Sequence, residues 1–290
     1  MSVNAPISKN NPLTSYMRQP KIYITLPSGG KYWPAKSIEI PENGELPVYS
    51  MTAKDELMFK TPDALLNGQA IVDVIQSCIP NIKNAWACPT IDIDVIFIAL
   101  RLATYGEMMP MKTKVPVINE ETEFELDLRN LLDDLQSRFR WEEEISLADN
   151  LTVYVKPLTY KHMTQISIKS FESNRILNLV NDDNISDDKK LELFNTSFAN
   201  LTQITVDLMA DSVYKIETAD GEVTDLKFIR EFVSNSDKSV FEMIKTHLDM
   251  LKSNNEIKPM RLGTTLEQQA EGAPQTFEVP INFNNSDFFG

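Results

Sequence analysis

The longest uninterrupted apolar run in the sequence, residues 95–100, is six residues long. A helix that spans a membrane needs about 20 consecutive apolar residues, so a membrane-spanning fold is not expected. Asp92 and Asp94 stand just before the run, where acidic residues favour the positive end of a helix, and Gly106 stands where a helix commonly ends. The sequence therefore predicts a helix over residues 95–104, begun by Asp92 as cap or first-turn acid, and buried at the centre of the first half of the chain.

Short segments in which polar and apolar residues alternate lie on both sides of this helix, and most end at turn residues. Such alternation indicates strands with one buried face, whereas apolar residues three and four positions apart indicate helices. Strands are predicted over residues 21–26, 46–49, 112–118, 123–128, 151–155, 213–218, 222–224 and 276–283. Further helices are predicted over residues 52–60, 65–78, 131–139, 160–180, 187–209, 225–233 and 236–251.

This order of elements predicts an α+β fold. We expect a small N-terminal β-ribbon, central helices with inserted β-hairpins, and a mostly helical C-terminal half with one hairpin and an extended C-terminal tail. Four parts are expected: a flexible N-terminal arm (1–20), an α+β domain (21–157), a helical domain with a β-hairpin (158–252), and a linker with the extended tail (253–290). The first part is polar and lacks the apolar stretch of a secretory signal, so action in a cytosol is expected.

The charged residues exclude several classes of function. The chain has 42 Asp and Glu against 28 Lys and Arg, a formal net charge of −14, and it has no cluster of Lys and Arg. Nucleic-acid phosphates and anionic lipids favour clustered cations, so neither nucleic acid nor a membrane is expected as a partner. Soft metal ligands are confined to Cys78, Cys88, His162 and His247, whose spacing matches no zinc motif. No catalytic, cofactor-binding or metal-ligating set is predicted.

Acidic residues are concentrated in residues 117–150, which hold 11 Asp and Glu against 3 Arg. The run Glu142, Glu143 and Glu144 is interpreted as a solvated face or a docking surface for a basic partner, because adjacent residues point in different directions. One alternative is a metal-dependent or acid/base hydrolase that uses the carboxylates of residues 133–144. Another alternative, a small-molecule binding module, rests only on the size of the chain.

Several short blocks of the sequence, in their order and spacing, resemble the baseplate protein family of contractile-tailed, T-even-type bacteriophages. The resemblance extends over residues 22–290 and is closest in the first 110 residues. The blocks are LPSGGKYW at 26–33, MTAKDE at 51–56, DID at 92–94, IALR at 98–101, YG at 105–106, ADGE at 219–222, FEVPI at 277–281 and NSDFF at 285–289.

This resemblance implies a non-enzymatic part in building the baseplate hub, as a hub subunit or as an assembly factor of the hub. The implied partners are other baseplate hub or tail proteins, and a homo-oligomer is compatible with the resemblance. The implied location is the host cytoplasm during assembly and the tail baseplate of the virion. The aromatic residues Phe283, Phe288 and Phe289 are predicted to anchor the C-terminal tail in a partner, with a tail folded onto its own core as the alternative.

Many members of this family carry Cys-x-x-Cys pairs where hairpins meet their turns, which suggests zinc knuckles. This sequence departs from that pattern, because the predicted turn at residues 119–122 and the loop at residues 263–274 contain no cysteine. A zinc role is therefore not carried over, and ordinary turns are expected at both places.

Overall fold

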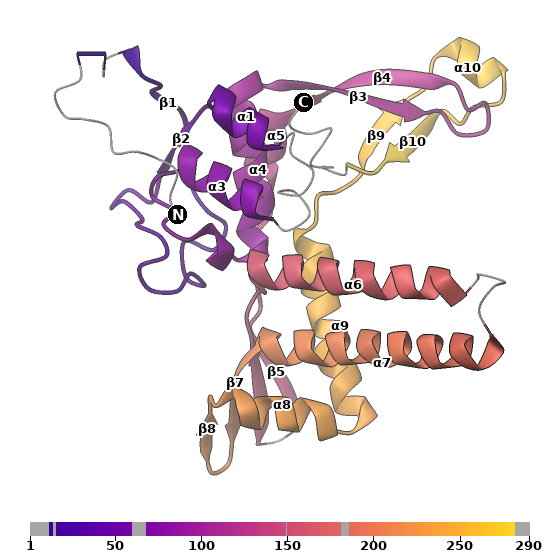
Figure 1. Ribbon diagram of the computed structural model, residues 1–290. Coiled ribbons are helices and arrows are strands. Elements are labelled where there is room, and N and C mark those ends of the chain that lie inside the picture. Colours follow the sequence, from indigo (N-terminus) through magenta and orange to yellow (C-terminus); the bar gives the residue numbers. More distant parts are fainter. Residues whose placement is uncertain (1–11, 14–15, 60–67, 149, 181–185, 282–290) are drawn as a thin grey trace.

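The structure is a computed structural model that describes residues 12–13, 16–59, 68–148, 150–180 and 186–281 (Figure 1). It confirms the α+β class, because helices and small antiparallel sheets occur together along the chain. The helices are α1 Ala53–Phe59, α3 Gln69–Cys78, the 3-10 helix η2 Ala85–Ala87, α4 Thr90–Tyr105, α5 Leu128–Arg138, α6 Tyr160–Val180, α7 Asp187–Ser212, α8 Leu226–Asn235, α9 Lys238–Asn255 and α10 Leu266–Ala270. The strands are β1 Pro20–Ile24, β2 Leu46–Tyr49, β3 Met108–Lys114, β4 Glu121–Asp127, β5 Glu144–Ala148, β6 Leu151–Val155, β7 Val213–Thr218, β8 Gly221–Val223, β9 Met260–Gly263 and β10 Thr276–Val279.

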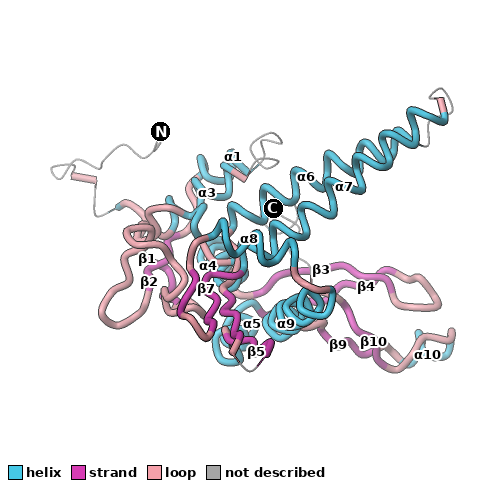
Figure 2. The backbone as a smooth tube through the Cα atoms, turned by 90° about the horizontal axis from the view of Figure 1, so that it is seen from below, coloured by secondary structure: helices cyan, strands magenta, loops and turns pink. Residues whose placement is uncertain are grey.

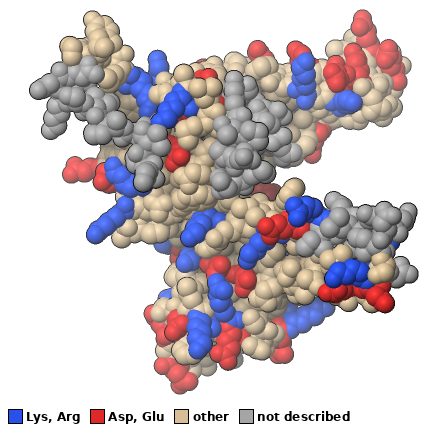
Figure 3. All heavy atoms as spheres, in the orientation of Figure 1, with Lys and Arg blue, Asp and Glu red and all other residues tan. Residues whose placement is uncertain are grey.

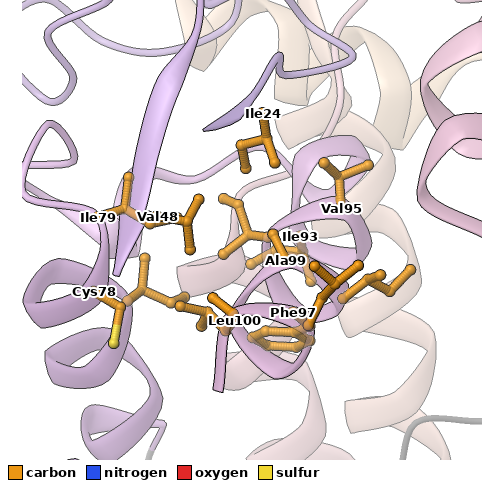
Figure 4. Packing of buried hydrophobic residues seen from close by; sticks show 14 of the residues in the cluster. Ile24, Val48, Cys78, Ile79, Ile93, Val95, Phe97, Ala99 and Leu100 are labelled. Carbon is orange, nitrogen blue, oxygen red and sulfur yellow. The ribbon is translucent and has the colours of Figure 1, made fainter. Parts of the chain in front are cut away.

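The first lobe surrounds α4, which confirms the predicted central helix. Side chains of α4 pack against Ile24 of β1, Val48 of β2 and Cys78 of α3 (Figure 4). The antiparallel ribbon β1–β2 and the helices α3 and α5 complete this core. Most of α4 is buried, as its nearly continuous apolar character requires. Its N-cap is Pro89, so Asp92 is a first-turn acid and its carboxylate does not cap the helix.

The second lobe is an antiparallel sheet of strand order β5-β6-β7-β8 packed against α7, α8 and α9. Its core includes Val153 of β6, Val213 of β7, Ile229 of α8 and Ile244 of α9. The turn signal Asp220-Gly221 lies between β7 and β8, where the sequence predicts a hairpin. Strand β6 belongs to the predicted part 21–157 and β7 belongs to the predicted part 158–252. The two strands pair within this one sheet.

Two arms project from the lobes in the same general direction (Figure 1). The β arm consists of the hairpins β3–β4 and β9–β10 with α10. The helical arm is the antiparallel pair α6 and α7, which are 21 and 26 residues long and therefore extend about 32 and 39 Å. Figure 2 shows both arms extending to the same side of the molecule, separate from one another. No helix among the described residues has the length and apolar character needed to cross a membrane.

Polar contacts join the two loops at the tip of the β arm, where the resembling family carries cysteine pairs. The Gln268 side-chain amide donates to the Glu120 carboxylate over 3.0 Å. The Val115 amide donates to the Glu120 carbonyl over 2.9 Å and closes the turn after β3. A capping box between Thr265 and Gln268 starts α10. These hydrogen bonds hold both loops in shape, as expected for turns without cysteine.

Several local expectations were wrong. The sequence predictions missed β5, β9 and α10, and they extended one strand to residue 118 although β3 ends at Lys114. Pro116 consequently lies in the turn between β3 and β4. The turn begins early because Val117 and Asn119 take positive φ values, of 75° and 56°, which no regular strand accommodates.

Candidate functional site

Asp92 connects the turn of residues 26–33 to the start of α4 through hydrogen bonds. The side chain is fully buried, and one carboxylate oxygen accepts from the Ser28 amide over 2.9 Å. The other oxygen accepts from the Ser28 hydroxyl over 2.5 Å and from Trp33 Nε1 over 2.8 Å. Burial raises the pKa of Asp92, and the hydrogen bonds from Ser28 and Trp33 oppose that shift. Two sequence blocks that are far apart in the chain therefore meet at one buried carboxylate.

Gly30 is required by the same turn. Its φ is +86°, and a Cβ there would lie 2.2 Å from Cδ1 of Ile40. A larger residue would meet backbone strain at this positive φ and would displace the terminal methyl group of the exposed Ile40 side chain. The two glycines of this block therefore serve a tight turn, as their spacing indicates, and no helix follows them as a phosphate loop would need.

Glu143 joins the two lobes. Its carboxylate accepts from Tyr32 over 2.5 Å and is paired with Lys31 Nζ at 2.6 Å, both from the turn of the first lobe. It also accepts from the Tyr214 hydroxyl over 3.2 Å, from β7 of the second lobe. Burial alone would raise the pKa of Glu143, but these partners together hold it below its ordinary value. Glu143 therefore links the turn of the first lobe to β7 of the second lobe.

The other two members of the predicted acidic run point elsewhere. Glu142 and Glu144 are exposed, while Glu143 between them is half-buried. His247 contacts the run only through the Glu142 carbonyl, at 2.9 Å from Nε2. The alternative of a hydrolase relied on the carboxylates of residues 133–144. One of these, Asp134, pairs with Arg138 on the same helix at 2.7 Å. Within the described residues, no group of at least three His, Cys, Asp or Glu side chains is arranged to hold a metal ion.

A cleft of about 570 Å³ lies between the lobes, at the root of the helical arm. It is bounded by the first turns of α4, the end of α5, and faces of α6, α7 and α9. Its apolar side chains are Pro27, Ile91, Ile93, Val95, Leu135, Phe139, Trp141, Leu158, Met163, Ile166, Leu208, Met209, Leu248 and Leu251. Its charged side chains are Arg138, Lys156, Lys245 and Lys252 together with Asp94, Asp249 and Glu256. The predominantly apolar lining makes this cleft the main candidate binding site.

Asp94 lines the cleft although it stands only two residues from Asp92. Two positions on a helix are about 200° apart, so one carboxylate faces the turn and the other faces the cleft. Burial and, to a smaller extent, Glu256 raise the pKa of Asp94 to about 6. The sequence pattern Asp-Ile-Asp identified this helix start, but it did not separate the different tasks of the two acids.

Arg18 belongs to the first lobe, although the sequence placed it in a flexible arm. Its guanidinium donates to the Ser50 and Ser77 carbonyls over 2.7 and 2.6 Å and lies 3.5 Å from the buried Asp55 carboxylate. Asp55 also accepts from the Thr52 amide, and its own amide donates to the Thr52 hydroxyl, a capping interaction at the start of α1. A carboxylate that is buried, as Asp55 is, requires a cation nearby, and this requirement was the one indication of the contact with Arg18.

The three phenylalanines predicted to anchor the C-terminal tail are not placed by the structure. Phe283, Phe288 and Phe289 lie outside the described residues. Of the soft-ligand residues, Cys78 and Cys88 are free and buried. His162 contacts the Thr159 hydroxyl at 3.0 Å.

One comparison with known proteins gives a match over most of the chain. The model of a family described as T4 bacteriophage base plate protein matches residues 19–262. No curated protein and no solved structure matches the chain. The matched residues include the turn held by Asp92, the junction at Glu143, the cleft and the helical arm.

Proposed function

The chain belongs to the T4 bacteriophage base plate protein family, and from this membership we propose that it helps to build the hub of the baseplate through protein–protein contacts. The family match over residues 19–262 is the observation that carries the proposal. In this proposal the chain acts without catalysis, in the host cytoplasm during assembly, as a hub subunit or as an assembly factor. Its partners are other hub or tail proteins.

The two arms support a role in binding other proteins. Leu191 and Phe198 of the helical arm are 61% and 64% exposed, and Leu266 at the tip of the β arm is 83% exposed. Large apolar side chains exposed at projecting elements are typical of surfaces that become buried in an assembly. The lobes supply rigid bases for these arms, since each has a buried apolar core.

Two surfaces predicted from the sequence remain part of the proposal. Glu142 and Glu144 are exposed beside the junction and are proposed to contact a basic surface of a partner. Phe283, Phe288 and Phe289 are proposed to anchor the C-terminal tail in a partner.

The proposal is tested by removing the gene from the phage that encodes the chain. We expect infected cells to accumulate heads and unassembled tail proteins but no complete baseplate hub, and the wild-type gene supplied in trans should restore infectious particles. Normal baseplates in cells without the chain would contradict the proposal.

A further inference from the structure

Strand β4 of the β arm has a strand partner on only one of its two sides. It pairs with β3 in a two-stranded antiparallel sheet, and each of the two strands is seven residues long. They are the longest strands in the described part of the chain. The other side of β4 therefore presents backbone N–H and C=O groups that no strand among the described residues pairs with.

The hydrogen bonds at the two ends of the hairpin show which residues of β4 present these groups. The Leu128 amide donates to the Glu107 carbonyl, and the Val115 amide donates to the Glu120 carbonyl. In this register the even-numbered positions of β4 bond to β3, and alternate residues of a strand bond on opposite sides. The odd-numbered positions therefore direct N–H and C=O away from β3, and these are Glu121, Glu123, Glu125 and Asp127.

The β4 edge is open to an added strand, whereas the β3 edge of the same sheet is interrupted. Glu121, Glu123 and Glu125 are exposed, and within the described residues their backbone groups bond to no other element. On β3, Pro110 stands opposite Glu125, at a position that points away from β4. Proline has no N–H to donate, so it blocks strand addition at that edge. The β4 edge contains no proline and can accept a strand along its length.

The carboxylates of the edge residues lie on one face of β4, because side chains two positions apart share a face. Glu123 is paired with Lys112 of β3 at 2.9 Å, but both side chains are about 70% exposed, and such a pair is weak. Glu121 and Glu125 have no ion pair in the described part of the chain. The two lysines of the hairpin, Lys112 and Lys114, are both on β3. A strand added beside β4 would therefore meet the row of carboxylates before it meets the lysines.

The balance of charge around the edge also favours a basic partner. Residues 108–127 hold 5 Asp and Glu against 2 Lys, so the hairpin remains acidic after its ion pair is counted. Figure 3 shows more acidic than basic side chains on the visible face of the β arm, at the upper right. The formal net charge of the whole chain, −14, has the same sign. Local and overall charge therefore both attract a segment that contains Lys or Arg.

The opposite face of β4 is more apolar. Phe124 is half-buried there, and Leu126 belongs to the core of the first lobe. Neighbouring strands of a sheet place side chains of the same face side by side. A strand beside β4 would thus have every second residue next to a carboxylate and the residues between them next to Phe124 and its neighbours.

We propose that the free edge of β4 binds an extended segment of a partner protein as an added antiparallel strand. The segment has Lys or Arg at alternate positions, opposite Glu121, Glu123 and Glu125, and apolar residues between them. Antiparallel addition continues the hairpin and is the more stable pairing per residue. The seven residues of β4 extend about 23 Å, which sets the length of the segment. The assignment of this segment to a hub or tail protein rests on the proposed function, whereas the free edge does not.

Two other occupants fit less well. A second copy that paired through its own β4 would place two rows of carboxylates side by side, and like charges on paired strands are destabilising. A second copy that paired through β3 would meet Pro110, which cannot donate. The last residues of the chain, 282–290, contain no Lys or Arg and so cannot supply the complementary charges.

The test uses the full chain and fluorescein-labelled peptides of about nine residues, long enough to span β4. The first peptide alternates Lys with Val, and the second has Glu in place of every Lys. Two further forms of the Lys peptide carry one N-methyl group each, on the central Lys or on the neighbouring Val. In the proposed strand the Lys N–H points toward β4 and the Val N–H points away from it. Binding is measured by fluorescence anisotropy at low and moderate salt.

We expect the Lys peptide to bind about tenfold more tightly than the Glu peptide, with the difference falling at higher salt. The N-methyl group on Lys should lower the affinity about tenfold, because it removes a hydrogen bond to β4, and the one on Val should leave it unchanged. These two peptides differ only in which side of the added strand is blocked, so they separate strand addition from simple attraction of charges.

Two variants at one position of β4 make the same distinction in the chain. Glu123→Pro removes an N–H that points away from β3, so the hairpin keeps its own hydrogen bonds and peptide affinity should fall about tenfold. Glu123→Gln removes the same carboxylate and keeps the N–H, so affinity should fall only about twofold. Glu242→Lys, at an exposed position of α9, is the control for net charge and should bind like the wild type.

Equal binding of the Lys and Glu peptides, equal binding of the two N-methylated peptides, or wild-type affinity in Glu123→Pro would overturn the proposal. A wild-type dimer that Glu123→Pro converts to a monomer would also overturn it, because a second copy would then occupy the edge. The N-methylated peptides are measured on the wild-type chain, so their result holds even if Glu123→Pro does not fold. Normal hub assembly without the chain would remove the proposed function but leave these results unchanged.

Discussion

Asp92 and Asp94 are expected to respond in opposite directions when each is changed to Asn. The pKa of Asp94 is about 6 in the folded chain, against an ordinary value of 3.8. At 1.36 kcal/mol per pH unit, this difference lowers stability by about 3 kcal/mol at neutral pH relative to pH below 4. The sign follows because the folded state binds the proton more tightly, so stability falls as pH rises through the folded pKa. Solvent at the mouth of the cleft reduces the expected effect to about 1–3 kcal/mol.

Asp94→Asn should therefore stabilise the chain by about 1–3 kcal/mol at pH 7.5 and have little effect at pH 4. Asp92→Asn should destabilise it by about 2–4 kcal/mol at pH 7.5, because an NH2 group replaces one of the two carboxylate oxygens. One oxygen accepts from the Ser28 amide and the other accepts from the Ser28 hydroxyl and Trp33, and an NH2 group can accept none of these hydrogen bonds. Both free energies of unfolding are measured by urea denaturation, followed by circular dichroism and tryptophan fluorescence.

The comparison controls for the change itself, since both variants replace one acid by Asn in the same turn of α4. A loss of more than about 1 kcal/mol for Asp94→Asn at pH 7.5 would refute the reasoning, because it would assign a favourable ionic contact to this carboxylate. An equal gain at pH 4 and pH 7.5 would also refute it, because the gain would then be independent of ionisation.

Three further changes test the contacts that hold the lobes and the ends of the chain. Arg18→Met should lower the free energy of unfolding by about 2–3 kcal/mol, because it leaves the buried Asp55 carboxylate without its cation; urea denaturation measures this. Glu143→Gln should cost about 1–2 kcal/mol at pH 7, and the difference from wild type should disappear as pH falls below the ordinary value of 4.5, because the depressed pKa stabilises only the ionised form. Deleting residues 288–290 should leave the melting temperature unchanged while weakening hub assembly in a complementation assay; unchanged assembly would remove the docking role proposed for Phe288 and Phe289.

Elements with strong local signals could be predicted from the sequence. Helix α6 and strand β6 have the predicted bounds, and the hairpin β7–β8 was found from its Asp-Gly turn. Strand β5 was missed because its pairing with β6 and the burial of Ile145 stabilise it, and neither is visible in a segment that begins in an acidic run.

The candidate site was less accessible to sequence reasoning because its contacts are distant in the chain. Asp92 and Ser28 are 64 residues apart, and Tyr32 and Glu143 are 111 apart. The block at residues 26–33 was recognised as a turn, but its partner was not. Similarly, the pattern of apolar residues on α7 indicates a helix face, and only the packing of the lobes reveals that half of this face lines a cleft.

Quantitative mass spectrometry of purified virions and of hub intermediates from infected cells tests the central claim most directly. The account predicts that the chain occurs at a fixed molar ratio to other hub proteins, in the virion if it is a subunit and only in the intermediates if it is an assembly factor. Absence of the chain from both, while it is abundant in the same infected cells, would contradict the claim that it builds the hub through protein contacts.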